Sequence, residues 1–355
     1  MTFRRAAAVL GALLAAWVAL GLYSRARRAP RLPPPPGEMR GAWHVHTTRS
    51  DGRGDLDEVV RAARESGLQF VVVADHNVLA PGDAGWRDGV LVVPATEISA
   101  PYGHVVGIGI SRELAREERQ RDALGTVGRL GGEAVLAHPF HPGRPFTRWT
   151  RDDWSGMEVV SSDSFWGLVR RDQAWWRAGK ALLLLPWDPG RSMLSFYQDP
   201  ARELARYDAA AARRRVALFC ASDAHGWPTY GAAFEAFSLH VPVAPTGDGV
   251  TDVAAVRRAL LDGSAWCVLD ALAPASGVRL SVAPTGDRID LAATTPGKLR
   301  PAWLLFRDGA PVGAMATAPG GWAWNCGGPC PPGAWRVEGR RDGTPWVFTN
   351  PVWIE

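Results

Sequence analysis

Six of the eight histidines in this 355-residue chain lie within or just after short apolar stretches that resemble buried strands. Residues of the types that bind transition metals occur along the chain in the order His44, His46, Asp51, Asp75, His76, Glu97, His104, His138, Asp223 and His225. The carboxyl ends of barrel strands meet at one rim, so residues placed there converge on one site. The pattern predicts a polynuclear metal centre and makes a hydrolytic metalloenzyme the leading hypothesis.

Apolar runs alternate with helical patterns through the first three quarters of the chain. Strands are expected at 41–46, 70–74, 90–94, 104–110, 134–137, 156–160, 181–185 and 216–221. Helical spacing covers 55–65, 113–129, 167–178 and 201–214. These strands are apolar throughout, which is typical of a parallel sheet or barrel with helices outside it. The sequence therefore predicts an α/β domain over residues 38–273.

The pattern changes after residue 273. Short runs rich in tryptophan and valine alternate there with Gly/Pro turns. Such spacing predicts a small antiparallel β-sandwich over residues 274–355.

Residues 1–37 are predicted to hold a membrane anchor or signal followed by a Pro-rich linker. Residues 6–23 carry no charge, follow Arg4 and Arg5, and are near the minimum length for a spanning helix. An uncleaved anchor, a cleaved signal and a buried core helix all fit this stretch. The arginines at 25, 27, 28 and 31 favour a cytoplasmic body, whereas the cysteines favour export.

The charge balance gives no indication of nucleic-acid binding. The formal net charge is +4, but residues 1–40 hold seven arginines and one acid. The rest carries 33 basic and 35 acidic side chains, a net charge of −2. The basic residues instead flank the apolar segment, which points to a membrane.

The four cysteines fall into two classes. Cys220 and Cys267 lie in apolar runs and are predicted to be buried free thiols. Cys326 and Cys330 enclose Gly-Gly-Pro, which favours a short disulfide over half of a zinc site. A disulfide implies an oxidising compartment. We therefore expect the body to be membrane-anchored or exported, outside the cytoplasmic membrane.

Residue spacing suggests how the ligands are aimed. Side chains at i and i+2 on a strand point to one face, so His44 with His46, and Asp223 with His225, each direct two groups to one place. A mixed imidazole and carboxylate set suits zinc, manganese or iron. Glu97 is a candidate for a carboxylate that bridges two ions. His141 and His240 match no motif and are expected to be structural, and Asp163 is expected to be a solvated loop carboxylate.

In series, these segments resemble the motifs of the PHP (polymerase and histidinol phosphatase) family. The resemblance covers residues 39 to about 273. It rests on His44-x-His46-x4-Asp51-Gly, Ala-Asp75-His76-Asn77, Glu97, Gly-His104-Val-Val-Gly, Ala-His138-Pro and Ser-Asp223-Ala-His225-Gly. Asp51 stands where some members have histidine.

The resemblance implies a distorted (β/α)7 barrel with two or three divalent metal ions. It assigns one ion to His44, His46, Glu97 and Asp223. It assigns a second to Glu97, His104 and His138, and a third to Asp51, His76 and His225. Asp75 would orient a ligand histidine from behind. His225 would either hold the third ion or act as general acid.

The implied activity is a phosphoesterase that uses a metal-bridging hydroxide on a small phosphorylated substrate, either a monoester or a diester. Two alternatives stay open: a non-catalytic envelope binding module stapled by metal, and an amide or ester hydrolase on the same ions. The sequence does not indicate the oligomeric state.

Overall fold

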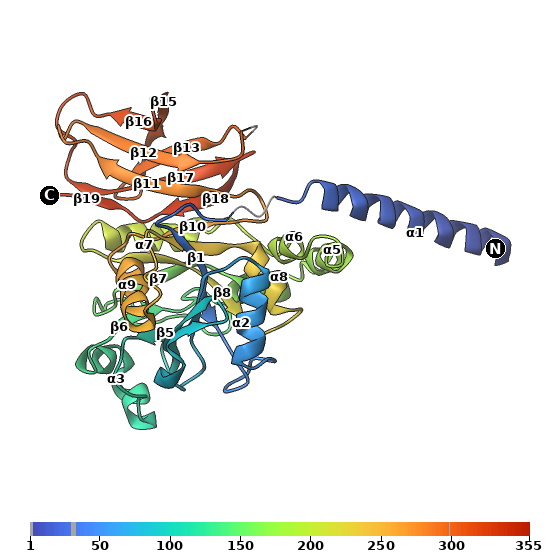
Figure 1. The fold of residues 1–355 in the computed structure, drawn as a ribbon, viewed down its shortest axis with the longest axis horizontal. Coiled ribbons are helices and arrows are strands. Elements are labelled where there is room, and N and C mark those ends of the chain that lie inside the picture. The colour runs from blue at the N-terminus through green and yellow to red at the C-terminus, as the bar shows by residue number, and fades with distance from the viewer. Residues whose placement is uncertain (1–2, 30–32, 298) are drawn as a thin grey trace.

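The computed structural model describes residues 3–29, 33–297 and 299–355. Residues 30–32 of the predicted linker, including Arg31, lie outside the described residues. The chain forms an N-terminal helix, a barrel surrounded by helices and a β-sandwich packed against the barrel (Figure 1).

The barrel is a closed ring of seven strands. They are β1 Met39–Val45, β2 Phe70–Val73, β4 Val90–Ala100, β5 Gly103–Ile108, β6 Glu133–Leu136, β7 Gly156–Ser161 and β8 Ala217–Ala224. Strands β1 and β8 pair in parallel and close the ring, with Trp43 beside Ala221. Trp43 and Phe219 are fully buried, and their rings lie 4.3 Å apart in the core. The predicted seven-stranded barrel is thus present.

One barrel strand runs against the others, which differs from the predicted parallel sheet. Strand β5 pairs antiparallel with both β4 and β6, whereas the other barrel pairs are parallel. Only Pro101 and Tyr102 connect β4 to β5. A link that short permits a hairpin but no parallel crossover.

The predicted strand at 181–185 is wrong, because residues up to 184 belong to helix α5 Trp175–Leu184. Alanine and leucine are strong helix formers, and a short apolar run alone does not separate a strand from a helix. The helix predicted at 167–178 is correspondingly two helices, α4 Ser162–Arg171 and α5.

The remaining helices lie around the barrel (Figure 1). They are α2 Leu56–Glu65, α3 Arg116–Arg129, α6 Pro189–Leu194, α7 Ala201–Ala211, α8 Tyr230–Ala236, α9 Gly249–Leu261 and the 3-10 turn η1 Pro81–Asp83. Before the C-terminal strands, the chain also forms the short strands β3 Gly85–Arg87, β9 Ser238–Val241 and β10 Trp266–Val268, which are not part of the ring.

The C-terminal residues form two antiparallel sheets, as the Gly/Pro-punctuated pattern predicts. One sheet contains β11 Ser276–Val282, β12 Arg288–Thr294, β16 Gly321–Asn325 and β15 Ala316–Ala318. The other contains β14 Ala310–Ala314, β13 Ala302–Arg307, β17 Gly333–Arg341, β18 Thr344–Thr349 and, on β17, β19 Val352–Ile354. The second sheet continues through β10 and β9 into β1, so barrel and sandwich share a hydrogen-bonded sheet.

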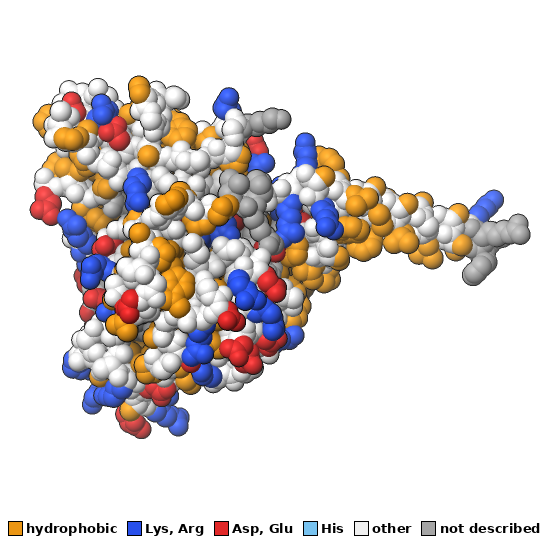
Figure 2. Space-filling model, in the orientation of Figure 1, with side chains coloured by type: hydrophobic (Ala, Val, Ile, Leu, Met, Phe, Trp, Pro, Cys, Tyr) orange, Lys and Arg blue, Asp and Glu red, His pale blue; other side chains and the backbone are white. Residues whose placement is uncertain are grey.

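Helix α1 Phe3–Ala26 projects from the body beside α5 and α6 (Figure 1). From Arg5 to Ala26 it is long and apolar enough to cross a membrane, a property that signal sequences share. Figure 2 shows hydrophobic side chains along the helix and basic side chains near both of its ends. Because most large apolar side chains of α1 are exposed, α1 is not a buried core helix, which was one of the three alternatives for residues 6–23.

All four cysteines form disulfides. The predicted Cys326–Cys330 bond is confirmed. The prediction of free thiols at Cys220 and Cys267 is wrong, because these residues form a second disulfide with 6.0 Å between their Cα atoms. Burial was predicted correctly, but a local pattern does not reveal that β8 and β10 lie together. Two disulfides are typical of a protein outside the reducing cytoplasm.

Removing the Cys220–Cys267 disulfide should destabilise the protein more than removing Cys326–Cys330. The residues of the first bond are 47 positions apart, against 4 in the second. Loop-closure entropy then predicts losses of about 4 and about 2 kcal/mol. Urea unfolding of Cys220→Ala/Cys267→Ala and Cys326→Ala/Cys330→Ala tests this. Equal losses would contradict the loop-length argument.

Candidate metal centre

The predicted ligands lie together at one rim of the barrel. His44 and Asp223 end strands β1 and β8, and His138 follows β6. Because β5 is antiparallel, His104 reaches the same rim from the beginning of its strand, opposite Ser99 of β4. Reversing one strand therefore adds a ligand to the centre that the other strands build with their carboxyl ends.

Glu97 lies at the middle of the centre, and its two carboxylate oxygens face different groups of imidazoles. Oε1 lies 2.7 Å from His104 Nδ1 and 2.8 Å from His138 Nε2. Oε2 lies 3.2, 3.4 and 3.0 Å from ring nitrogens of His44, His46 and His76, respectively. This is the arrangement that a carboxylate shared by two cations requires.

Asp223 supplies a second buried carboxylate next to the first imidazole group. Its Oδ1 lies 3.1 Å from His46 Nε2 and 3.7 Å from His44 Nε2. One donor atom from each of these three residues falls within 4.8 Å of the others. With Glu97 they make up the residues expected around the first ion.

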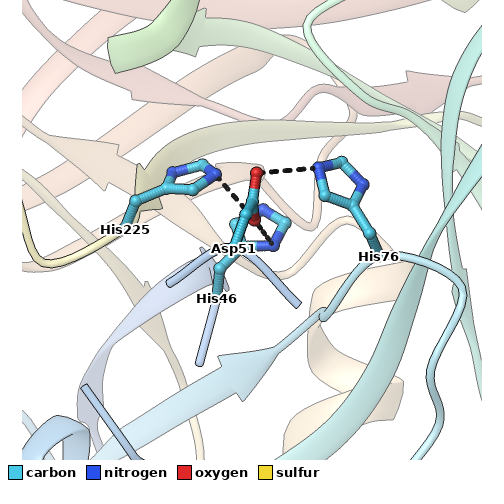
Figure 3. A group of neighbouring side chains, drawn as sticks. All are labelled: His46, Asp51, His76 and His225. Carbon is cyan, nitrogen blue, oxygen red and sulfur yellow. Dashed lines mark ion pairs between the residues drawn. The ribbon is translucent and has the colours of Figure 1, made fainter. Parts of the chain in front are cut away.

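A third group lies at the open side of the centre, where Asp51 reaches in from the turn after β1 (Figure 3). Its carboxylate lies 3.6 Å from His46 Nδ1, 3.5 Å from His76 Nε2 and 3.3 Å from His225 Nε2. The side chain of Asp51 is 54% exposed, whereas His46 is buried. His76 approaches Glu97 through its other nitrogen, so it touches two of the expected groups.

The backbone is strained at three of the ligands. His44, His138 and Asp223 have φ values of 65°, 28° and 44°, in the left-handed region that side chains other than glycine seldom adopt. Such conformations cost about 1–3 kcal/mol each and persist where the surrounding fold enforces them. Here they turn the chain at strand ends and direct each side chain to the centre.

Glu158 on β7 is a functional residue that the sequence pattern missed. It is buried, and its Oε1 lies 2.7 Å from His44 Nδ1 and accepts a bond from Trp43 Nε1. Its Oε2 accepts the backbone N–H of His138 at 2.6 Å. Glu158 thus fixes the His44 ring so that Nε2 faces Glu97. The one signal was a glutamate inside the apolar run 156–160.

Asp75 lies behind the centre, but it acts on the loop after β1 instead of directly on a ligand. Its carboxylate accepts bonds from Thr47 N, Thr47 Oγ1 and Ser50 Oγ at 2.6–2.7 Å. Ser50 Oγ in turn lies 3.4 Å from His46 Nδ1. Among the described contacts its link to a ligand histidine is therefore indirect.

His141 and Asp163 flank the centre. Asp163 is not the solvated loop carboxylate expected, because α4 begins directly after β7 and holds it at the rim. It pairs with Arg144 and lies 3.3 Å from His141 Nε2. One of its oxygens also comes within 4.8 Å of donor atoms of His138 and Asp223. His240, as expected, is structural: it lies remote from the ligands and bonds Glu38 at 2.6 Å.

The centre has the electrostatics of a cation receptor. Burial raises the pKa of Glu97, but the imidazoles of His44 and His138 and their neighbours hold it well below its usual range. Burial likewise opposes ionisation of Asp223, yet His44, His46 and His138 keep the pKa of Asp223 well below normal. Burial lowers the pKa of His138, but Glu97, together with Asp223 and Glu158, outweighs burial and raises that pKa to about 9. Both carboxylates are therefore anionic and draw positive charge to the imidazoles.

The donor set fits divalent transition metals. His44 Nε2 and His76 Nδ1 are buried and have no hydrogen-bond partner among the described residues, although each lies near Glu97. A buried ring nitrogen without a hydrogen-bond partner destabilises the folded protein unless it binds a cation or carries a proton that is shared with a neighbour. Imidazole with carboxylate suits zinc, manganese or iron.

A pocket of about 250 Å³ opens beside the metal centre. Its polar lining comprises Ser162, Asp163, Ser222, Asp223 and His225, and its large apolar side chains are Trp166, Met193, Phe196 and Trp227. A substrate group could therefore lie next to the ligands of the third group while an apolar part contacts the tryptophans.

No family model matches the chain. A relative, the uncharacterized protein MJ1587 of Methanocaldococcus jannaschii, is 23% identical over 119 residues, which are 29% of this chain and 70% of that protein. It identifies no activity.

Among solved structures, the chain is similar to a two-domain protein from Bacteroides vulgatus containing a predicted PHP-like metal-dependent phosphoesterase. The identity is 14% and the TM-score 0.42, over 92% of this chain and 99% of that one. The chain is also similar to an amidohydrolase from Chromobacterium violaceum with bound sulfate and no metal. The sequence identity is 15% and the TM-score 0.32, over 52% of this chain and 87% of that one. For a candidate metal-dependent phosphoesterase from Bifidobacterium adolescentis, the sequence identity is 16% and the TM-score 0.32, over 54% of this chain and 89% of that one.

Of these three solved structures, the Bacteroides vulgatus protein is described as containing a PHP-like domain. At these identities and TM-scores the likeness carries no weight for the chemistry.

Replacing Glu158 with glutamine should weaken metal binding by roughly 10- to 100-fold, because the His44 ring loses the carboxylate that orients and polarises it. Competition with a chelator, after reconstitution with manganese, measures the affinity. Metal analysis of the parent should find at least two ions per chain. Glu133→Gln, an exposed change on β6, is the control. A metal affinity of the Glu158→Gln variant within threefold of the parent would show that Glu158 does not support metal binding.

Proposed function

We propose that the protein is a metal-dependent hydrolase that cleaves phosphoric esters of small molecules. One observation carries this proposal: Glu97 presents one oxygen to His104 and His138 and the other to His44, His46 and His76. A closed structural site needs only four ligands around one ion. A larger set that shares a carboxylate and opens to a pocket is what hydrolysis needs.

Divalent ions held by these groups supply Lewis acidity toward a phosphoryl oxygen and lower the pKa of a coordinated water. The residues of the chain set the conditions for that chemistry. Glu97 and Asp223 provide buried negative charge, and Glu158 keeps the His44 ring in place. His225 has its side chain 31% exposed and lines the pocket, so it is placed either to hold a third ion with Asp51 or to protonate the leaving group.

The phosphoester class is supported by the motif resemblance and by the pocket. Asp223 and His225 lie on the side of the pocket that borders the metal centre, and the apolar lining includes Trp166 and Trp227. A phosphoryl group at the ions with an organic group against Trp166 and Trp227 fits this division. Either a monoester or a diester satisfies it.

Glu97→Ala and Asp223→Ala should each abolish phosphoesterase activity and leave the fold largely intact, because each removes a carboxylate that holds the activating ion. Hydrolysis of an aryl phosphate with added manganese measures the effect. Asp57→Ala, at an exposed position on α2, should behave as the parent does. Activity within tenfold of the parent in either centre variant would show that the assignment is wrong.

The parent protein should also be screened against phosphomonoesters, cyclic and linear phosphodiesters, carboxylic esters and amides. Turnover of phosphoric esters supports the proposed class and separates mono- from diesterase. Turnover of amides or carboxylic esters alone overturns it. Metal binding without any turnover supports the non-catalytic alternative.

We also propose that the body lies outside the cytoplasmic membrane and that α1 tethers it there. The support is the apolar, exposed α1 and the two disulfides. The arginines at 25, 27, 28 and 31, which follow the uncharged residues 6–23, oppose export, but long domains translocate despite flanking charge.

Alkaline phosphatase fused after residue 355 should be active in cells, because that reporter folds only where disulfides form. A green fluorescent protein fusion at the same site is the counterpart and should be dark. The reverse pair of results would place the body in the cytoplasm.

A further inference from the structure

Large apolar side chains that face solvent are concentrated on two helices. Of the 13 such residues among the described part of the chain, seven lie on α1. Four more lie on α5: Trp175, Trp176, Leu182 and Leu183, which are 53–65% exposed. Trp227 and Val250 are the other two. A ten-residue helix with four such side chains is unusual for a surface in water, and such patches mark interaction sites.

We propose that the exposed face of α5 is a second membrane-contacting surface, inserted beside α1 into the phospholipid bilayer. The position of α1 carries this inference. Trp17 Nε1 donates a hydrogen bond to Leu183 O at 3.1 Å, and the Trp17 and Trp187 rings lie 5.4 Å apart. The body therefore touches the C-terminal half of α1 as far as Trp17, not merely the last turn of the helix.

The contact lies within the apolar stretch of α1. At about 1.5 Å of rise per residue, Trp17 is about 13 Å along the helix from Ala26. Gly21 also faces Trp187, where a Cβ atom would come within 2.2 Å of the indole. When α1 spans a bilayer, Leu183 and Trp187 consequently lie at the depth of its apolar residues. This step rests on the proposed membrane placement of α1 and is independent of the proposed hydrolase activity.

The composition of α5 suits a lipid interface. No Asp or Glu occurs between Gln173 and Trp187, and Lys180 is exposed where it could meet lipid phosphate. Tryptophan favours the boundary between headgroups and acyl chains, and leucine favours the acyl chains. A second protein copy would also cover apolar residues, but α1 already requires lipid at the same place.

The other side of α5 is fixed to the body, so the exposed face is a stable surface. Ala181 is buried, and its carbonyl accepts a bond from Ser192 Oγ at 2.7 Å. Arg177 donates to the carbonyls of Ser195 and Tyr197. Trp175 contacts Trp166, whose ring lines the pocket at the metal centre. The proposed lipid contact thus lies one aromatic ring away from the pocket wall.

The test uses the full chain with one added cysteine. The four native cysteines are all disulfide-bonded, so a thiol-reactive NBD dye labels only the added one. Leu182→Cys reports on α5, with Leu183→Cys as a second reporter if the first variant misfolds. Leu13→Cys on α1 is the positive control. Val250→Cys on α9, which is 83% exposed, is the matched control in water. Each chain is placed alone in a nanodisc of phosphatidylcholine and phosphatidylglycerol, with or without spin-labelled acyl chains.

The α5 label should show a blue shift and lose fluorescence when spin-labelled lipid is present, as the α1 label does, while the α9 label shows neither. A quenched α1 label with an unquenched α5 label overturns the proposal and leaves α1 in the membrane. Two unquenched labels overturn both placements. A blue shift at α5 that appears only with several chains per disc identifies a second copy as the partner and also overturns the proposal.

Discussion

The carboxylate of Glu97 is the feature on which the centre depends. It is 1% exposed, and an isolated buried carboxylate would be strongly destabilising. Imidazoles from five places in the sequence surround it instead, and they hold its pKa well below the usual range despite its burial. A protein that keeps a buried anion among neutral or singly protonated rings has built a strong site for cations. The negative charge that favours protons on the imidazoles also favours metal ions, so binding of metal should release those protons.

The barrel supplies the rigidity that this arrangement needs. Three ligands adopt left-handed backbone conformations, and each lies in or directly after a hydrogen-bonded strand. Strain of this kind relaxes unless neighbouring strands prevent it. The hairpin from β4 to β5 adds His104 on the strand next to Glu97, so one short turn fixes the distance between the shared carboxylate and one of its imidazoles.

Much of this centre follows from the sequence because its residues obey local rules. Strand ends, the two i,i+2 pairs and the motif order are all visible without a structure. The sequence did not predict the role of Glu158, because that role comes from packing beside His44, which is more than a hundred positions away in the chain. The Cys220–Cys267 disulfide was not predicted either, because its two cysteines are brought together only by the fold. The run at 181–185 was mistaken for a strand because it is as apolar as the barrel strands, yet it lies in α5, where Leu182 and Leu183 are exposed and not part of the core.

The β-sandwich supports the strand that carries Asp223 and is more than an appended module. The side chain of Asn350, just after β18, accepts the Leu218 N–H at 2.6 Å and donates to the carbonyl of Ala265. Cys267 on β10 is bonded to Cys220 on β8, three residues before Asp223. Without these contacts, the buried Leu218 N–H would lose its acceptor, at a cost of roughly 1–3 kcal/mol. Asn350 therefore ties the beginning of β8, the strand that carries Asp223 near its other end, to the C-terminal residues of the chain.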